Sequence, residues 1–259
     1  VGVPGESLRG KRAAGAVQVL YSSASGITDH DQLWHQGRKG VKGALEKGDG
    51  FGTVLTSSDF DADGFADLAI GSARESTKAG HHTGRVVVLR GSAAGLRAGG
   101  VQSWNEGSAG IASEPLKDEG FGEILEAGDV TGDGFDDLLI VVRDMAEGEW
   151  HGAVHLLLGS AAGLTSVGSQ YIGLTDLGIG LTDQYTLIYS LSLGDVNADG
   201  REDLALNADG HDTVLLHGHA DGFRPGPLVA PGQPGKDTIW RESYGAALSN
   251  AVASAAWCV

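Results

Sequence analysis

A long internal repeat is the feature of this sequence that most constrains its fold. Acidic segments begin at Asp59, Asp129 and Asp195, so that successive segments are 70 and then 66 residues apart. An apolar segment follows each of them, reading DLAIGS, DLLIVV and DLALNA. A second apolar segment also recurs, beginning at Gly15, Gly84, Gly152 and, in a looser copy, at Asp212. Repeats of this length are typical of domains assembled from copies of one supersecondary unit.

Each repeat has the composition of about four short β-strands. Val, Leu and Ile dominate the apolar segments, which end in small residues and Gly, as strands that enter turns do. A third, weaker segment has Trp at matching places, in DQLWHQ (31–36) and VQSWNE (101–106). Four short antiparallel strands form a sheet that cannot bury both faces alone, which is the structure of a propeller blade. The sequence therefore predicts an all-β propeller as a single domain over residues 1–259, with repeats at about 1–48, 49–118, 119–183 and 184–243, and with 244–259 closing the first blade.

Aromatic–glycine pairs precede the acidic segments. They occur in GDGFG (48–52), in GFG (120–122) and again in SYG (243–245), and Tyr185 is expected to hold the same place in the fourth repeat, although Thr186 follows it. With these motifs, nearly the whole chain resembles the FG-GAP repeat family, whose repeats form the propellers of integrin α-subunits and occur in many secreted bacterial proteins. The resemblance implies a β-propeller of about four FG-GAP blades, each with four strands.

The resemblance leaves the closure of the ring open. The resemblance implies a ring of seven blades, and the four blades expected in this chain are unusually few. The C-terminal YGAALS also departs from the family pattern, because no acidic segment follows it. A closed four-bladed monomer, part of a larger ring and a ring completed by other chains therefore remain as alternatives.

The acidic segments have the spacing of calcium-binding loops. Side-chain oxygens at positions 1, 3 and 5 can converge on one point if the loop curls, and the glycine at position 6 permits the sharp turn. Hard oxygen ligands without His or Cys favour Ca²⁺ over zinc or copper. The segments lack the Glu at position 12 and the flanking helices of an EF-hand, so we expect strand–loop–strand sites. The predicted ligands are Asp59, Asp61, Asp63, the Phe65 carbonyl and Asp67; Asp129, Thr131, Asp133, the Phe135 carbonyl and Asp137; and Asp195, Asn197, Asp199, the Arg201 carbonyl and Asp203.

The three loops are expected to differ in affinity and to serve the fold. Thr131 stands where the other loops have a carboxylate or an amide, so the second site is expected to be the weakest. Solvated Asp-Gly turns are the alternative, but three copies in one register, each followed by Asp-Leu, favour metal sites. A structural role for the calcium is expected, because a catalytic metal needs open positions and nearby acid–base groups. Weak calcium sites suit an extracellular setting, where calcium is roughly millimolar, so we expect a secreted protein.

Charge and cysteine content limit the partners. The net charge of −16 argues against nucleic acid and against an anionic membrane surface, since both need clustered Lys and Arg. No apolar run approaches the roughly 20 residues of a membrane-spanning helix. The single cysteine, Cys258, excludes an internal disulfide and is either an inert thiol or a bridge to a partner chain. The sequence starts at Val1 without a leader, and a mature or cut chain is therefore expected.

No catalytic motif is found in the sequence. The patterns G-x-S-x-G, G-x-x-x-x-G-K-[ST] and H-E-x-x-H are absent, so we expect no enzyme. The predicted function is a secreted, calcium-stabilised binding module that recognises a carbohydrate or protein surface, as lectins and adhesion proteins do. The alternatives are a non-catalytic propeller portion of a larger secreted enzyme or toxin, and a catalytic site on the propeller itself.

A ligand site is expected at the end of the propeller opposite the calcium loops. Loops that join strands 2 and 3 of a blade, or one blade to the next, gather there and vary in length, whereas the calcium loops are nearly uniform. Variable loops on a rigid scaffold are where recognition is usually built. Merely solvated loops are the alternative. The candidate ligand-binding residues on these loops are Arg38, His81, His82 and Trp150.

Overall fold

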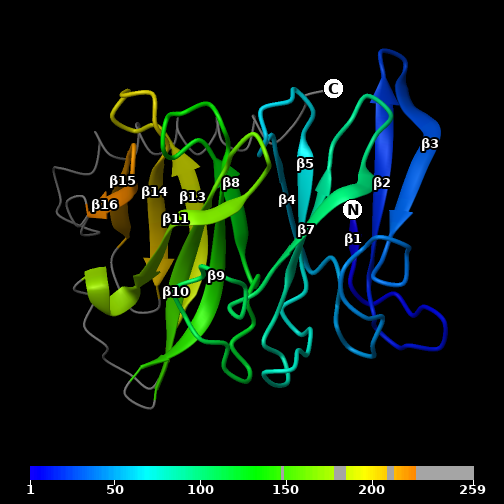
Figure 1. Cartoon of the computed structure of the whole chain (residues 1–259), viewed down its shortest axis with the longest axis horizontal. Helices are drawn as coiled ribbons and strands as arrows, with labels where there is room; N and C mark the ends of the chain where they lie inside the picture. The colour runs from blue at the N-terminus through cyan, green and yellow to red at the C-terminus, as the bar shows by residue number, and fades with distance from the viewer. Residues whose placement is uncertain (147–148, 178–184, 209–212, 226–259) are drawn as a thin grey trace, which may run out of the picture.

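The computed structural model describes residues 1–146, 149–177, 185–208 and 213–225. These residues form four antiparallel sheets that stand side by side, one after another along the chain (Figure 1). In each sheet, consecutive strands are antiparallel neighbours, and one further short strand adds to the third sheet in parallel. This arrangement confirms the predicted all-β fold of propeller blades.

Each sheet is built from a consecutive part of the chain. The first sheet contains β1 (Gly2–Val3), β2 (Ala16–Ser23) and β3 (Gly26–Trp34). The second contains β4 (Val54–Ser58), β5 (Asp67–Gly71), β6 (Val86–Arg90) and β7 (Arg97–Trp104). The third contains β8 (Leu125–Gly128), β9 (Asp137–Ala146), β10 (Glu149–Leu158) and β11 (Thr165–Gly173), and the short β12 (Tyr185–Thr186) adds to β10 in parallel. A 3₁₀ turn, η1 (Leu174–Leu177), precedes the fourth sheet of β13 (Ile188–Gly194), β14 (Asp203–Ala208), β15 (Val214–His219) and β16 (Gly222–Pro225).

The first sheet has three strands in the described part of the chain. Its β1 pairs with β2 as β5 pairs with β6, so β1 matches the second strand of the other blades. Among the described residues, this sheet has no strand that corresponds to β4. The segment predicted to complete this blade, 244–259, lies outside the described residues, as does Cys258, and its role stays a prediction.

Apolar side chains fill the space between neighbouring sheets. Val17 and Trp34 of the first sheet pack with Ile70 and Val87 of the second around buried Phe51. A second cluster joins the second and third sheets around Phe60 and Phe121, and a third cluster joins the third and fourth sheets. Burying both faces of each strand explains why segments such as VVVLR read as continuous apolar runs rather than alternating ones.

The aromatic–glycine pairs tie each blade to the one before it. Phe51 and Phe121 are completely buried and form isolated parallel bridges to Gly15 and Gly84. A Cβ on Gly84, which has φ of +82°, would lie 2.2 Å from the backbone nitrogen of Phe121. Only glycine permits this approach, which explains why the second apolar segment begins with Gly in these two blades.

The expectation that Tyr185 holds the aromatic place in the fourth repeat is wrong. Tyr185 and Thr186 pair with Trp150 and His151, so Leu187 follows on beside Gly152, the third-blade counterpart of Gly84. Leu187 also precedes Asp195 by eight residues, as Phe51 precedes Asp59. By this spacing Leu187 corresponds to the aromatic residue, and a Cβ on Gly152 would lie nearest to the next residue, the buried Ile188.

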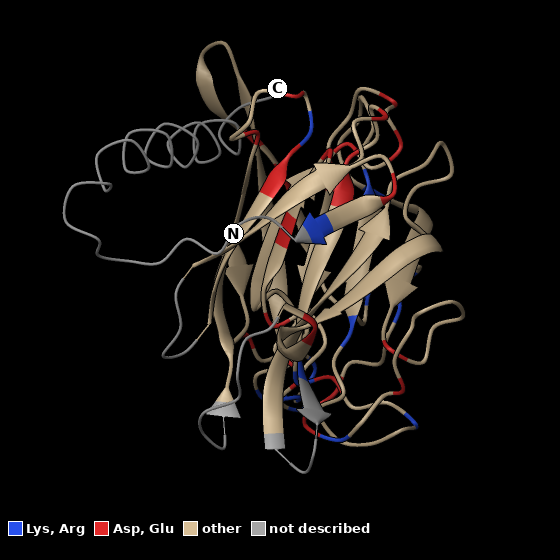
Figure 2. Cartoon of the chain, turned by 90° about the vertical axis from the view of Figure 1, so that its left-hand side faces the viewer, with Lys and Arg blue, Asp and Glu red and all other residues tan. Residues whose placement is uncertain are grey.

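The loops gather at two ends of the sheets with different charge. The three acidic segments join β4 to β5, β8 to β9 and β13 to β14, at the upper end of Figures 1 and 2. Many of the Asp and Glu residues lie at that end, whereas most Lys and Arg lie toward the other (Figure 2). Trp150, predicted to lie on a variable loop, instead lies in β10, where it pairs with Met145 of β9.

Candidate metal centres

The first acidic loop curls around the carboxylate of its first residue. The Oδ atoms of Asp59 accept hydrogen bonds from the backbone N–H groups of Asp63 (3.1 Å) and Gly64 (2.8 Å). Positive φ angles at Ala62 and Gly64 produce this curl. As a result, one carboxylate oxygen each from Asp59, Asp61 and Asp63 lies within 4.8 Å of the others, as convergence on one ion requires.

The other two loops repeat the same hydrogen bonds. Asp129 accepts from Asp133 N (3.1 Å) and Gly134 N (2.9 Å). Asp195 accepts from Asp199 N (3.0 Å) and from the N–H of the next glycine, Gly200 (2.9 Å). The structure therefore closes all three loops in the same turn from position 1 to positions 5 and 6, and Phe65, Phe135 and Arg201 lie in the same loops. That the carbonyls of these three residues bind a metal stays a prediction.

The carboxylate at position 9 of each loop is buried beneath the turn. Asp67, Asp137 and Asp203 are each 1% exposed. Each accepts a hydrogen bond from the N–H of a glycine at the end of the third strand, namely Gly91 (2.7 Å), Gly159 (2.9 Å) and Gly218 (3.0 Å). Burial raises the pKa of Asp67 and raises that of Asp137 to about 7. A bound dication would favour the charged form of both groups.

Two buried oxygens at position 3 have no hydrogen-bond partner among the residues that the structure describes. One is Asp61 Oδ1, in a side chain that is 9% exposed, and the other is Oγ1 of Thr131, a residue that is 4% exposed. A buried acceptor left without a partner costs about 1–3 kcal/mol, so such groups usually have a partner atom. Both oxygens lie at predicted ligand positions, and the side-chain atoms predicted to bind the metal in these loops are oxygens. The residues thus fit a hard cation such as Ca²⁺.

The residue opposite the position-9 carboxylate differs between the blades. In the first loop it is Arg90, whose Nη1 contacts both Asp61 and Asp67. In the second it is Leu158, and in the third it is His217, whose Nδ1 lies 3.2 Å from Asp203 Oδ1. An arginine side chain therefore contacts two of the predicted calcium ligands of the first loop. The sequence-based prediction that the second site is the weakest did not consider this contact.

Hydrogen bonds connect neighbouring loops to one another. Asp136 Oδ2, beside the second loop, accepts from Ser58 Oγ (2.5 Å) and from Asp59 N (3.0 Å) in the first. Arg201 of the third loop donates from Nε to the Thr131 carbonyl of the second (3.1 Å). A metal ion bound at one loop would thus be positioned to order the next, a connection that residue spacing within one loop cannot reveal.

The four candidate ligand-binding residues lie on three different blades and do not form one cluster. Arg38 stacks over the buried Trp34 ring at 3.8 Å and donates to the Leu33 carbonyl, so it supports its own loop. His81 contacts Ser76, and His82 contacts Asp118 at 3.2 Å. Trp150 lies in β10.

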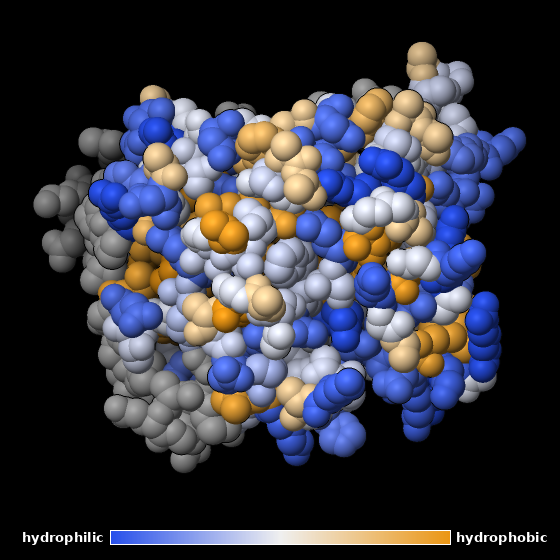
Figure 3. Space-filling view, viewed as in Figure 1, coloured by the Kyte–Doolittle hydropathy of each residue, from blue (hydrophilic) through white to orange (hydrophobic). Residues whose placement is uncertain are grey.

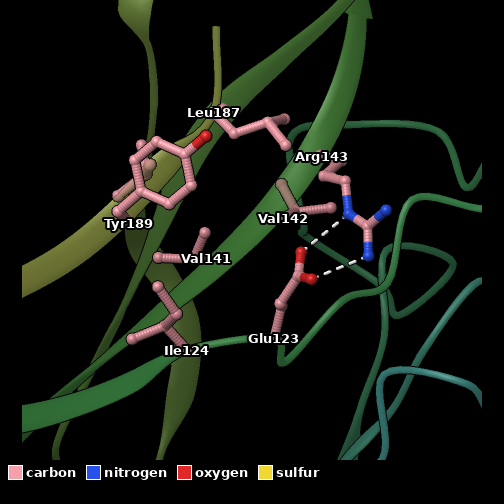
Figure 4. A pocket seen from close by; sticks show the side chains of 9 residues that line it. Glu123, Ile124, Val141, Val142, Arg143, Leu187 and Tyr189 are labelled. Carbon is pink, nitrogen blue, oxygen red and sulfur yellow. Dashed lines mark hydrogen bonds and ion pairs between the residues drawn. The ribbon is translucent and has the colours of Figure 1, made fainter. Parts of the chain in front are cut away.

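His82 lines a hollow of about 720 Å³ at the end opposite the acidic loops. Its other lining residues come from the first three blades and include many glycines, together with Arg74, Arg143 and Glu123. A second, smaller hollow of about 160 Å³ is walled by Ile124, Val141 and Tyr189, beside the bidentate ion pair of Arg143 with Glu123 (Figure 4). The larger hollow has the size of a ligand pocket, and the smaller one does not.

Comparisons with known proteins agree with this geometry. A sequence profile described as "FG-GAP repeat" matches residues 51–89. Integrin alpha-4 of Xenopus laevis is 29% identical over 178 residues, covering 67% of this chain and 16% of the relative. Integrin alpha-PS2 of Drosophila melanogaster is 31% identical over 201 residues, covering 70% of this chain and 12% of the relative. Phosphatidylinositol-glycan-specific phospholipase D of Mus musculus is 29% identical over 161 residues, covering 61% of this chain and 18% of the relative.

The chain spans less than one-fifth of the length of these relatives. Within the described ranges, we find no helix with the length and apolar character needed to cross a bilayer. The matched residues 51–89 contain Phe51-Gly52, the loop with Asp59, Asp61 and Asp63, and the buried strands β5 and most of β6. The chain therefore belongs to the FG-GAP repeat family, and its sheets are integrin-like propeller blades.

Proposed function

We propose that this chain is a secreted binding module whose blades are held together by Ca²⁺ in three loops and whose ligand binds at the opposite end. The observation that carries the calcium proposal is the pair of buried, unpartnered oxygens of Asp61 and Thr131 at equivalent positions of two loops. Asp59, Asp129 and Asp195 would provide the first ligand of each site, and Asp67, Asp137 and Asp203 the last. The ion would supply positive charge that offsets the repulsion between carboxylates.

The proposed ligand is a protein or carbohydrate surface at the lower end of Figure 1. That end carries the loops between second and third strands and between blades, and it contains the hollow that His82 lines. Its loops differ from blade to blade, whereas the calcium loops repeat one set of hydrogen bonds. Uniform loops that bind metal at one end and variable loops at the other suit a binding module. In such a module, the first end stabilises the fold and the second recognises a partner.

A second candidate function is a non-catalytic propeller portion of a larger secreted enzyme. The match to a phospholipase D over 161 residues favours it, because an enzyme contains a segment similar to this chain. In that case, the ligand of the propeller would direct the enzyme to its substrate. Both candidates share the calcium loops and the ligand end.

The position of the ligand end can be tested with arrays of glycans and of extracellular proteins, probed in calcium. Replacing His82 or Trp150 with Ala is expected to weaken binding to any spot that wild type recognises by about tenfold, as loss of a contact worth about 1.4 kcal/mol does. The matched control is Thr131→Val at the calcium end, which should retain binding. If Thr131→Val lost binding while remaining folded, and the other two variants kept it, the ligand would bind at the calcium end.

A further inference from the structure

Eight exposed cationic side chains lie at one end of the first two blades of this acidic protein. They are in the loops 4–15, 35–50 and 72–84, which we call the cationic loops, and they are Arg9, Lys11, Arg12, Lys39, Lys42, Lys47, Arg74 and Lys78. With Arg38, the cationic loops contain nine Lys and Arg against four Asp and Glu, a formal charge of +5. The whole chain has −16, so the remaining residues sum to −21.

These eight cations have no ion pair or side-chain hydrogen bond among the described residues. Two of the four acidic residues of the cationic loops are buried and already engaged: Asp49 accepts from Glu46 N, and Glu75 accepts from Gln36 and Arg85. Only Glu6 and Glu46 are exposed there. The solvent-facing charge of the cationic loops is therefore unbalanced, in contrast to Arg143 and Arg224, which pair with acidic neighbours.

The three cationic loops form one continuous surface. The first contacts the second through the hydrogen bond from Gly48 N to the Arg12 carbonyl (3.0 Å). The second contacts the third through the bond from Gln36 Nε2 to Glu75 Oε2 (2.6 Å). All three also supply lining residues to the 720 Å³ hollow, among them Arg74. The lower edge of the surface in Figure 3, where such loops gather, is mainly hydrophilic.

The composition of the cationic loops favours a protein partner over a sugar, a membrane or a nucleic acid. Sugar rings and lipid both need exposed apolar or aromatic groups, and none of the large exposed apolar residues of the described chain lies in these loops. Trp34 is covered by Arg38. A long polyanion would extend beyond the patch toward the rest of a chain whose formal charge is −21, whereas a short acidic segment can stay on the patch.

We propose that the cationic loops bind a short acidic segment of a partner protein, with Asp or Glu side chains over Lys39, Lys42 and Lys47 and one carboxylate directed to Arg74 at the hollow. This inference deepens the proposed function, on which it rests, by naming the ligand chemistry of its ligand end. Opposite charge on the two partners accelerates their encounter and fixes their orientation, so the interaction weakens as salt screens it.

The test is the binding of a fluorescent oligo-glutamate peptide to the calcium-loaded chain, measured by anisotropy at low and at physiological salt. Wild type is expected to bind at low salt and to weaken with added salt, although the chain as a whole has the same sign of charge as the peptide. A variant with Lys39, Lys42, Lys47 and Arg74 all replaced by Gln is expected to bind about tenfold more weakly, since it loses four exposed ion pairs with the peptide. Lys39→Gln with Lys42→Gln should lose about threefold.

The matched control is Arg97→Gln with Arg224→Gln, which removes two exposed cations from the other end and should leave peptide affinity unchanged. Absence of wild-type binding at low salt would overturn the proposal, and so would equal losses in the control and quadruple variants, which would indicate a response to net charge rather than a site on the cationic loops. Equal competition by a uronic acid polymer or by phosphatidylserine vesicles would overturn the assignment to a protein segment. None of these results depends on whether EDTA changes the melting temperature, so this proposal and that of calcium-stabilised blades can fail separately.

Discussion

Removal of calcium with EDTA is expected to lower the melting temperature of this protein by about 10 °C. Each ion that binds only the folded chain stabilises it by about 1.4 kcal/mol when its concentration is tenfold above the dissociation constant, so three loops contribute about 4 kcal/mol. For a protein of this size, 1 kcal/mol corresponds to roughly 2–4 °C. Without the ion, clustered carboxylates in each loop repel one another, and the oxygens of Asp61 and Thr131 stay buried without a partner.

The melting experiment has matched controls in the chain. Asp137→Asn removes a ligand of the second loop and should reduce the response to EDTA by about one-third, if the three loops contribute equally. Asp221→Asn removes an exposed carboxylate of the same end that belongs to no calcium loop, and it should leave the response unchanged. An identical melting temperature with calcium and with EDTA, at the same ionic strength, would contradict the role of calcium.

Arg90→Leu is expected to have opposite effects with and without calcium. Arg90 contacts Asp61 and Asp67, and all three side chains are at most 10% exposed. Removing one partner of a buried ion pair leaves uncompensated buried charge and costs about 3–5 kcal/mol, so the metal-free variant should be much less stable. In calcium, the first loop should bind the ion about tenfold more tightly than in wild type, since the guanidinium no longer occupies Asp61 and Asp67.

The third blade, which contains the second acidic loop, provides the reciprocal control. Leu158 is its counterpart of Arg90, and Leu158→Arg should place a cation beside Asp137 and weaken calcium binding in that loop. Titration of each variant with calcium, followed by melting temperature, gives both effects. If Arg90→Leu lowered stability equally at zero and at saturating calcium, the arginine would be a packing residue rather than a substitute for the ion.

Much of the fold could be predicted from the repeat. The fourth repeat was aligned wrongly because the alignment followed the type of residue, an aromatic one, rather than its distance from the acidic loop. The apolar segments after Asp67, Asp137 and Asp203 are strands because alternate faces of each sheet pack against neighbouring blades. The fourth repeat was misaligned because an aromatic residue, Tyr185, lies close to the true position. The spacing of eight residues to the acidic loop, which identifies Leu187, was the better signal.

Contacts between distant residues could not be predicted from the sequence. Arg90 is separated from Asp67 by 23 residues, and its third-blade counterpart is a leucine, so no repeated pattern indicated the pairing. His155 lies in an apolar strand, yet its Nε2 contacts Glu106 Oε1 (3.3 Å) and Ser113 Oγ (3.2 Å) of the preceding blade. The net charge of −16 likewise concealed the cationic loops, because composition averages over both ends of the molecule.

Direct calorimetric titration of the metal-stripped chain with calcium tests the central claim that the acidic loops of these FG-GAP blades are calcium sites. Three ions should bind per chain, one for each loop that begins at Asp59, Asp129 and Asp195. The variant with all three of these residues replaced by Asn should bind none at millimolar calcium. Absence of binding by folded wild type, or unchanged stoichiometry in the triple variant, would contradict the account.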